Sequence, residues 1–115
     1  MPLSNLGHEQ IQLIHPQWSD LKPFIDVEIA PLIMTCWKLG IWTQQSCWNN
    51  TERQESWIQF RSIPDALKFL GFVIEVAKSM RLSTDRTILR PSVWFPHFEI
   101  PTLVTCLNHR LLVPM

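Results

Sequence analysis

Hydrophobic residues recur at helical spacing in the first third of the chain. Ile29, Leu32, Ile33, Cys36 and Trp37 lie at i, i+3, i+4, i+7 and i+8, which is one face of an α-helix. Such a stripe is typical of a helix that packs one side against a core. The spacing therefore predicts an amphipathic helix in this stretch.

Both ends of this helix carry local signals. Asp26 is an N-cap candidate, since its carboxylate can accept a hydrogen bond from a free N–H of the first turn. Pro31 would then lie past the first turn and remove one helical bond, so the regular helix begins near Ala30. Gly40 suits the left-handed position after the last turn, and Ile41 can seal the helix end by a hydrophobic contact.

Two strands and a polar turn follow. Ile41–Cys47 contains β-branched and aromatic side chains, whereas Ser56–Arg61 alternates, with Ile58 and Phe60 on one face. The connecting residues 49–55 are all polar, which is typical of a turn. We therefore expect the two strands to pair as a hairpin.

The second helix has the clearest start. Ser62 and Asp65 form a capping-box variant with Pro64 in the first turn. An apolar stripe predicts that the helix runs to about Met80, and Gly71 within it predicts a close approach to the sheet. The stripe comprises Ala66, Leu67, Phe69, Leu70, Val73, Ile74 and Ala77.

The remaining segments are shorter. Ile11–His15 is apolar and closed by a proline, which suits a first strand, and residues 16–24 are typical of a loop. Arg81–Arg90 is expected to be a basic loop and Ser92–Pro96 a last strand bounded by prolines. Pro101 suits the first position of a closing helix.

The expected order is β-α-β-β-α-β followed by a C-terminal helix. This order indicates an α+β fold of the ferredoxin-like type, a βαββαβ sandwich with a four-stranded antiparallel sheet and two helices on one face. A length of 115 residues suits a single α+β domain over residues 1–115.

The composition argues against several classes of partner. Ten basic and ten acidic residues cancel, so no net charge attracts nucleic acid or an anionic membrane. No apolar run approaches the ~20 residues of a membrane span. Three cysteines at no recognised spacing, Cys36, Cys47 and Cys106, favour free thiols in the cytoplasm, and neither a metal nor a cofactor is expected.

The stretch from Asp26 to Leu70 carries a family resemblance. The run DVEIAPLIMTCWKLGIWTQQSC, then WIQF and DALKFL, resembles a group of small uncharacterised bacterial proteins, of which cyanobacterial members are the most similar. That group repeats an Asp…Ile-Ala-Pro-Leu-Ile…Trp…Gly-Ile…Thr…Ser-Cys pattern, then an aromatic strand and an Asp-Ala…Phe-Leu helix. The group has no assigned activity, so the resemblance implies no chemistry.

A local similarity also extends to the wybutosine-synthesis methyltransferase family. In that family a helix is followed by a strand ending in Thr-Ser-Ser-Cys-Ser-Gly-Arg. This chain keeps Ser46 and Cys47 but continues with Trp48, Asn49 and Asn50, so it lacks the small basic turn expected to approach a nucleotide. The similarity implies related architecture, and neither tRNA nor methyl-donor binding.

Cys47, at a strand end, is the sharpest chemical candidate. A nucleophilic cysteine needs a lowered pKa and partial exposure. Cys47 could line a ligand pocket with Trp48, Asn49 and Arg53 of the polar turn and His97 from the end of the last strand. The alternative is a structural strand end without chemistry.

Six tryptophans are hard to bury completely in so short a chain. Trp42, Trp48 and Trp57 are expected to form an aromatic surface on the hairpin, with Arg61 beside it, and Trp42, Trp57 and Arg61 are the expected homodimer interface. The leading hypothesis is therefore a non-enzymatic binding or interaction module that acts as a homodimer through a tryptophan-rich face. One alternative is a small-molecule-binding protein or enzyme with its pocket at Cys47, and another is single-stranded RNA binding.

Overall fold

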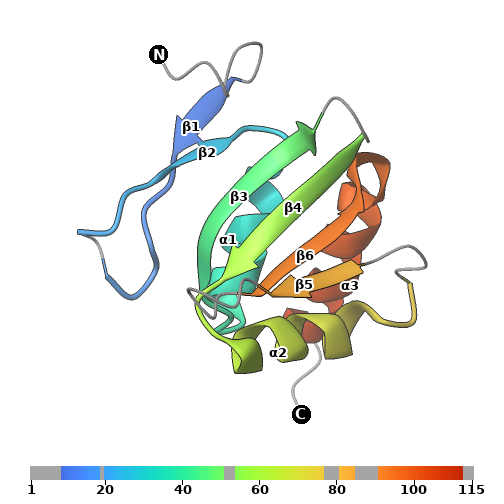
Figure 1. Cartoon of the computed structure of the whole chain (residues 1–115). Coiled ribbons are helices and arrows are strands. Elements are labelled where there is room, and N and C mark those ends of the chain that lie inside the picture. Colours follow the sequence, from blue (N-terminus) through green and yellow to red (C-terminus); the bar gives the residue numbers. More distant parts are fainter. Residues whose placement is uncertain (1–8, 19, 51–53, 77–80, 85–90, 113–115) are drawn as a thin grey trace.

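The computed structural model of the chain describes residues 9–18, 20–50, 54–76, 81–84 and 91–112 (Figure 1). Three α-helices, a short 3-10 helix and six strands occur in these residues. In chain order they are β1 (Gln10–Gln12), β2 (Phe24–Asp26), α1 (Ala30–Lys38), β3 (Thr43–Asn50), β4 (Glu55–Phe60), α2 (Ile63–Val73), β5 (Arg81–Thr84), β6 (Pro91–Pro96), η2 (His97–Glu99) and α3 (Ile100–Leu112).

The main sheet has the strand order β3-β4-β6-β5, and each neighbouring pair is antiparallel. The first two strands, β1 and β2, form a separate antiparallel pair. In Figure 1, α1 and α3 lie behind the main sheet, α2 runs below it, and the β1–β2 pair extends beyond β3. The predicted mixed α+β architecture is confirmed.

The predicted ferredoxin-like order is wrong in two places. Gln10–Gln12 does not join the main sheet but pairs with Phe24–Asp26, part of which was expected to be loop. Arg81–Thr84, expected in a basic loop, pairs with β6. The main sheet is therefore built from two strand pairs that are consecutive in the chain, β3 and β4 before α2 and β5 and β6 after it. A four-residue strand with one apolar side chain carries too little alternation to be recognised from sequence.

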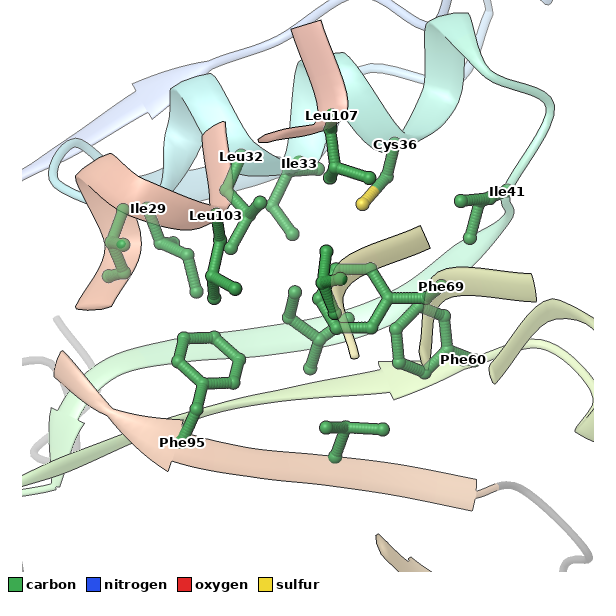
Figure 2. Packing of buried hydrophobic residues seen from close by; sticks show 14 of the residues in the cluster. Ile29, Leu32, Ile33, Cys36, Ile41, Phe60, Phe69, Phe95, Leu103 and Leu107 are labelled. Atoms are coloured by element: carbon green, nitrogen blue, oxygen red, sulfur yellow. The ribbon is translucent and has the colours of Figure 1, made fainter. Parts of the chain in front are cut away.

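The core lies between the helices and one face of the sheet, as Figure 2 shows. The inward side chains of β4 and β6 alternate with half-buried ones, which confirms the predicted orientation of Ile58 and Phe60. Opposite them pack the apolar stripes of the three helices. Fully buried members include Leu32, Ile33, Cys36, Phe69, Val93, Phe95, Leu103 and Leu107.

Helix α1 begins at Ala30, as expected from Pro31, but Asp26 does not cap it. Ile29 occupies the N-cap position and makes no side-chain capping bond. The C-terminal signals are confirmed, since Gly40 has φ +77° and its N–H donates to the Trp37 carbonyl at 3.0 Å. These contacts end the helix and direct the chain into β3.

Helix α2 starts where its capping box predicts, because the Ser62 hydroxyl accepts a hydrogen bond from the Asp65 N–H. The helix ends at Val73 rather than near Met80, although residues 77–80 lie outside the described part of the chain. Gly71 is exposed, and a Cβ there would meet nothing within 4 Å. The prediction that it permits a close approach to the sheet is therefore wrong.

Candidate functional site

Residues 9–18 and 20–26, which include β1 and β2, form an extended hairpin that we call the arm. Its ladder continues beyond the two strands, since the Leu13 N–H donates to the Pro23 carbonyl and the His15 N–H to the Leu21 carbonyl, both at 3.0 Å. The arm lies beside β3, the edge strand of the main sheet, and Figure 1 places β2 nearer to β3 than β1 is.

The base of the arm is joined to β3 by the carboxylate of Asp26. One oxygen, Oδ2, accepts the backbone N–H of Trp48 at 2.9 Å, and Oδ1 accepts the side-chain amide of Gln10 at 3.1 Å. Asp26 is only 3% exposed. A residue predicted to cap a helix thus connects the arm to the main sheet.

The far part of the arm is anchored by an aromatic cluster around His15. The imidazole is 4% exposed, and its ring centre lies 4.7 Å from that of Trp42 and 4.9 Å from that of Trp37. Trp18 of the arm lies 4.2 Å from Trp42. Sequence reasoning missed His15, because no local pattern reveals contacts between residues more than twenty positions apart.

Hydrogen bonds fix the orientation of the rings in this cluster. The N–H of Gln17 donates to Nδ1 of His15 at 3.1 Å, which requires the neutral imidazole. The indole N–H of Trp37 donates to the Thr43 hydroxyl at 2.8 Å. The guanidinium of Arg61 lies 4.8 Å from the centre of the Trp42 ring, so the predicted neighbours Trp42 and Arg61 do meet.

A groove lies between the arm and β3. Its larger compartment has a volume of about 400 Å³ and its smaller one about 170 Å³. Pro23, Ile25, Gln44 and Gln45 line both compartments, so the two are contiguous. We call them together the arm groove. The larger compartment is also lined by Gln10, Phe24, Ser46, Cys47 and Trp57, and the smaller by Leu21, Trp37, Trp42 and Thr43.

The walls of the arm groove are uncharged. Among the described residues that line it there is no lysine, arginine, aspartate or glutamate. Its polar side chains include the amides of Gln10, Gln44 and Gln45, each of which can both donate and accept hydrogen bonds, the hydroxyls of Thr43 and Ser46, and the Cys47 thiol. Such walls suit an amide-bearing, uncharged ligand better than a phosphate or a carboxylate.

Cys47 lies in the larger compartment, half buried, with its Sγ 3.7 Å from the Trp48 carbonyl oxygen. Burial raises the pKa of this thiol, and the nearby Asp26 carboxylate raises it further. The group is therefore a neutral thiol at physiological pH, and its surroundings oppose the thiolate that nucleophilic catalysis needs.

Replacing Asp26 by asparagine is expected to make Cys47 more reactive. The amide oxygen can still accept the Trp48 N–H, and Gln10 can turn its own amide to match the new NH₂ group. Loss of the negative charge then favours the thiolate, so alkylation of Cys47 at pH 8 should accelerate roughly two- to fivefold. Mass spectrometry that follows each cysteine separately measures this rate, and Cys106 is the internal control. An unchanged Cys47 rate would contradict the electrostatic effect of Asp26.

Trp57 and Trp48, two other predicted site residues, lie on opposite faces of the main sheet. Trp57 lines the arm groove with Cys47, and its ring lies 6.0 Å from that of Trp94. Trp48 instead packs against the core, with its ring 5.9 Å from that of His97. Because successive strand residues point to opposite faces, Cys47 and Trp48 do not share one pocket.

His97 is hydrogen-bonded to the turn of the β3–β4 hairpin. Its Nδ1 lies 2.8 Å from the Gln54 carbonyl oxygen, and its backbone N–H donates to the same oxygen. His97 does not line the arm groove. Arg53 lies outside the described residues, as does the side chain of Asn49.

A second hollow of about 640 Å³ lies between α2 and α3. Phe72, Cys106 and His109 are among its lining residues, and the Cys106 thiol donates to the Phe72 carbonyl at 3.1 Å. Cys47 and Cys106 therefore lie in different hollows. Across the described part of the chain, no three His, Cys, Asp or Glu side chains gather as a metal site would need.

The His15 cluster predicts a pH-dependent stability. Burial lowers the pKa of His15 from its ordinary value of 6.5, so the unfolded chain binds a proton more readily than the folded one. The stabilisation is complete above pH 6.5 and is lost as the pH falls below it. Urea midpoints at pH 7.5 and 5.5 should therefore differ less in His15→Gln than in the wild type. His109→Gln, an exposed control, should keep the full difference, and an equal difference in all three proteins would contradict the assignment.

Comparison with protein families, characterised proteins and solved structures found no match to this chain. The resemblance of residues 26–70 to uncharacterised bacterial proteins stays a prediction. Within the described residues, no helix combines the length and the apolar character needed to cross a lipid bilayer.

Proposed function

We propose that this protein is a non-enzymatic binding module that holds an uncharged ligand in the arm groove. The observation that carries the proposal is the contiguous groove, of about 400 and 170 Å³, between an arm and a sheet edge. Its larger compartment falls within the range of small-ligand pockets, roughly 300–1,000 Å³.

The side chains support binding rather than catalysis. An enzyme site needs a nucleophile or base with a matched pKa and a convergent partner. Cys47 has a raised pKa and lies near a carboxylate rather than a cation. Glutamine amides and indole rings are groups that orient and bury a neutral ligand. The absence of cationic side chains among the described lining residues also disfavours RNA, whose phosphates require lysine or arginine.

A screen of small uncharged fragments tests the proposal. Protein NMR with a library of neutral amides and heterocycles should show shifts at the Trp57 indole and the Gln44 and Gln45 amides. Cys47→Phe should fill the groove and abolish these shifts, whereas Cys106→Phe, in the other hollow, should leave them unchanged. The proposal fails if no neutral fragment shifts the groove residues, or if the shifts survive in Cys47→Phe.

Self-association through the arm is a second candidate function. The arm carries a series of large exposed apolar side chains, and an isolated hairpin is marginally stable in water. A homodimer would cover this surface together with the Trp57–Trp94 pair beside the groove. The exposed residues are Ile11, Ile14, Trp18, Leu21 and Phe24.

Sedimentation equilibrium tests the homodimer. The dissociation constant of the dimer should be larger in Phe24→Ser than in Leu67→Ser. Leu67 is the control, because it is also apolar and exposed but lies on α2, outside the arm. A monomer at all concentrations would contradict this candidate and leave ligand binding in the arm groove unaffected.

A further inference from the structure

The main sheet has one face that packs against the core and one that does not. In Figure 1, α1 and α3 lie behind the sheet, and none of the described helices lies in front of it. Ile58 and Val93 point to the core. Because successive strand residues alternate in direction, their neighbours Trp57 and Trp94 point to the other face, where both are half-buried. We call this second face the open face.

One row of residues across the open face carries two indole rings. Cys47 of β3 pairs with Trp57 of β4, and Trp57 pairs in turn with Trp94 of β6. The two indole ring centres lie 6.0 Å apart, and the ring planes are tilted by 42°. Cys47 and Trp57 also line the larger compartment of the arm groove. The row therefore leads from the arm groove to a second indole outside it.

The neighbouring row on the open face is polar and uncharged. Gln45 pairs with Gln59, and Gln59 pairs with Ser92. Each of the three lies two positions along its strand from a member of the first row, so both rows share one face. Within the part of the chain that the structure describes, the side-chain amides of Gln45 and Gln59 have no hydrogen-bond partner. These amides can both donate to a ligand and accept from it.

The geometry of the two indoles restricts what they can bind. A flat ligand held between two aromatic rings needs parallel rings about 7 Å apart, because each carbon contact takes ~3.5 Å. The rings of Trp57 and Trp94 are closer than this and are not parallel. No flat ring therefore enters between them. The pair suits two successive units of a chain, one against each indole and rotated relative to each other.

We infer that the ligand of the arm groove is an uncharged oligosaccharide, which extends from the groove over the Trp57–Trp94 pair. This inference rests on the proposed function and names the class of ligand. A sugar ring carries C–H groups on its faces, which can pack on an indole. Its hydroxyls both donate and accept hydrogen bonds, as glutamine amides do. Successive sugars rotate about their linkages and can follow two tilted rings.

The other classes of ligand fit these walls less well. A charged chain would lose water without gaining an opposite charge, since the described lining of the arm groove is uncharged. A purely apolar ligand would cover the amides of Gln45 and Gln59 without bonding to them, which is costly. A neutral chain rich in hydroxyls avoids both penalties. Its binding is non-covalent, and no bond is formed or broken.

Calorimetric titration of the whole protein provides the first test. The neutral probes are cellotetraose, xylotetraose, maltotetraose and N-acetylated chitotetraose, each compared with its single sugar. At least one tetrasaccharide should bind about tenfold more tightly than its single sugar, because only the chain spans both indoles. Tetragalacturonate, which is negatively charged, should bind about tenfold more weakly than the best neutral probe. Binding by no neutral tetrasaccharide, or equal binding of the charged one, would overturn the inference.

Aromatic variants test whether the chain reaches the second indole. Trp94→Ala should weaken binding of the tetrasaccharide about tenfold, whereas Trp94→Phe, which keeps a ring, should lose less. Phe98→Ala is the matched control, since Phe98 is an aromatic residue of η2 that is 71% exposed. In the wild type, the indole N–H resonances of Trp57 and Trp94 should both shift, which tests the contact without a variant. Equal affinities in Trp94→Ala and Phe98→Ala, or an unmoved Trp94 resonance, would overturn the inference.

An amide variant tests the polar row. Gln59→Leu removes the free amide and keeps a side chain of similar size, so the tetrasaccharide should bind about tenfold more weakly. Asn108→Leu, an exposed amide on α3, is the control and should bind as the wild type does. Thermal unfolding checks that both variants are folded. Equal affinities in the two variants would show that the amide row does not bind the sugar hydroxyls, which would overturn the inference.

The outcomes separate this inference from the proposed function. If neutral amide or heterocycle fragments bind the arm groove but no saccharide does, the binding module stands and the oligosaccharide is wrong. If neither binds, both are wrong. If no saccharide binds and the protein sediments as a dimer that Trp94→Ala dissociates, the open face joins two copies of the chain and the oligosaccharide inference is overturned.

Discussion

Replacing Phe69 by alanine should lower the free energy of unfolding by about 3–5 kcal/mol. Phe69 is fully buried at the centre of the core, and its ring lies 5.2 Å from that of Phe60 (Figure 2). Truncation removes the contact with Phe60 of β4 and packing within the core cluster, and the surrounding side chains can close the cavity only in part. Urea unfolding followed by circular dichroism measures the change.

Leu67→Ala is the matched control, because Leu67 lies on the same helix but is 55% exposed. Its effect should stay below about 1 kcal/mol. If Phe69→Ala also costs less than about 1 kcal/mol, the packing of α2 against the sheet is not what stabilises the fold.

Replacing Asp26 by alanine is expected to cost about 2–3 kcal/mol and to release the base of the arm. The carboxylate accepts hydrogen bonds from the Trp48 N–H and the Gln10 amide, and Asp26 is 3% exposed. Alanine removes this acceptor from the half-buried Trp48 N–H, which is costly, whereas the exposed Gln10 amide can bond to water instead. Urea unfolding measures stability, and hydrogen exchange at the Trp48 amide reports whether the arm still covers β3.

Two variants bracket this effect. Asp26→Asn keeps an oxygen for the Trp48 N–H and should cost less than half as much as alanine. Asp20→Ala removes an exposed carboxylate of the arm and should be nearly neutral. An Asp26→Ala protein with wild-type stability and wild-type Trp48 exchange would show that the arm is held by the His15 cluster alone.

The two attachments explain how an open groove can persist beside a sheet edge. A free edge strand tends to pair with whatever strand is near it. Here the arm is fixed by Asp26 at one end and by His15 at the other. Between these points the arm and β3 form no strand ladder, and side chains of both line the arm groove. Ligand binding should therefore depend on both attachments.

Local chemistry explains which elements were predicted correctly. The Ser62–Asp65 cap, the Gly40 helix end and the alternation of Ile58 and Phe60 each act within a few residues. Their energies depend on neighbours in sequence, so the pattern alone is informative. The β3–β4 hairpin was predicted correctly for the same reason, since its strands are joined by a short polar turn.

The candidate site was only partly predictable. Cys47, Trp42 and Trp57 were singled out from the sequence, and all three line the arm groove. His97 and Trp48 were grouped with Cys47 because they seemed near in sequence or topology, but strand alternation places Trp48 on the opposite face. The arm, which forms one whole wall, was expected to be a sheet strand and a loop.

Periodicity and locally acting caps were enough to predict the helices, the central hairpin and the inward faces of the strands. The folded chain was needed to reveal that Gln10–Gln12 pairs with Phe24–Asp26, that Asp26 binds β3, and that His15 packs against Trp37 and Trp42. Each of these contacts joins residues distant in sequence, and an aspartate or a histidine has suitable groups for several partners. The choice among them depends on which surfaces the folded chain brings together.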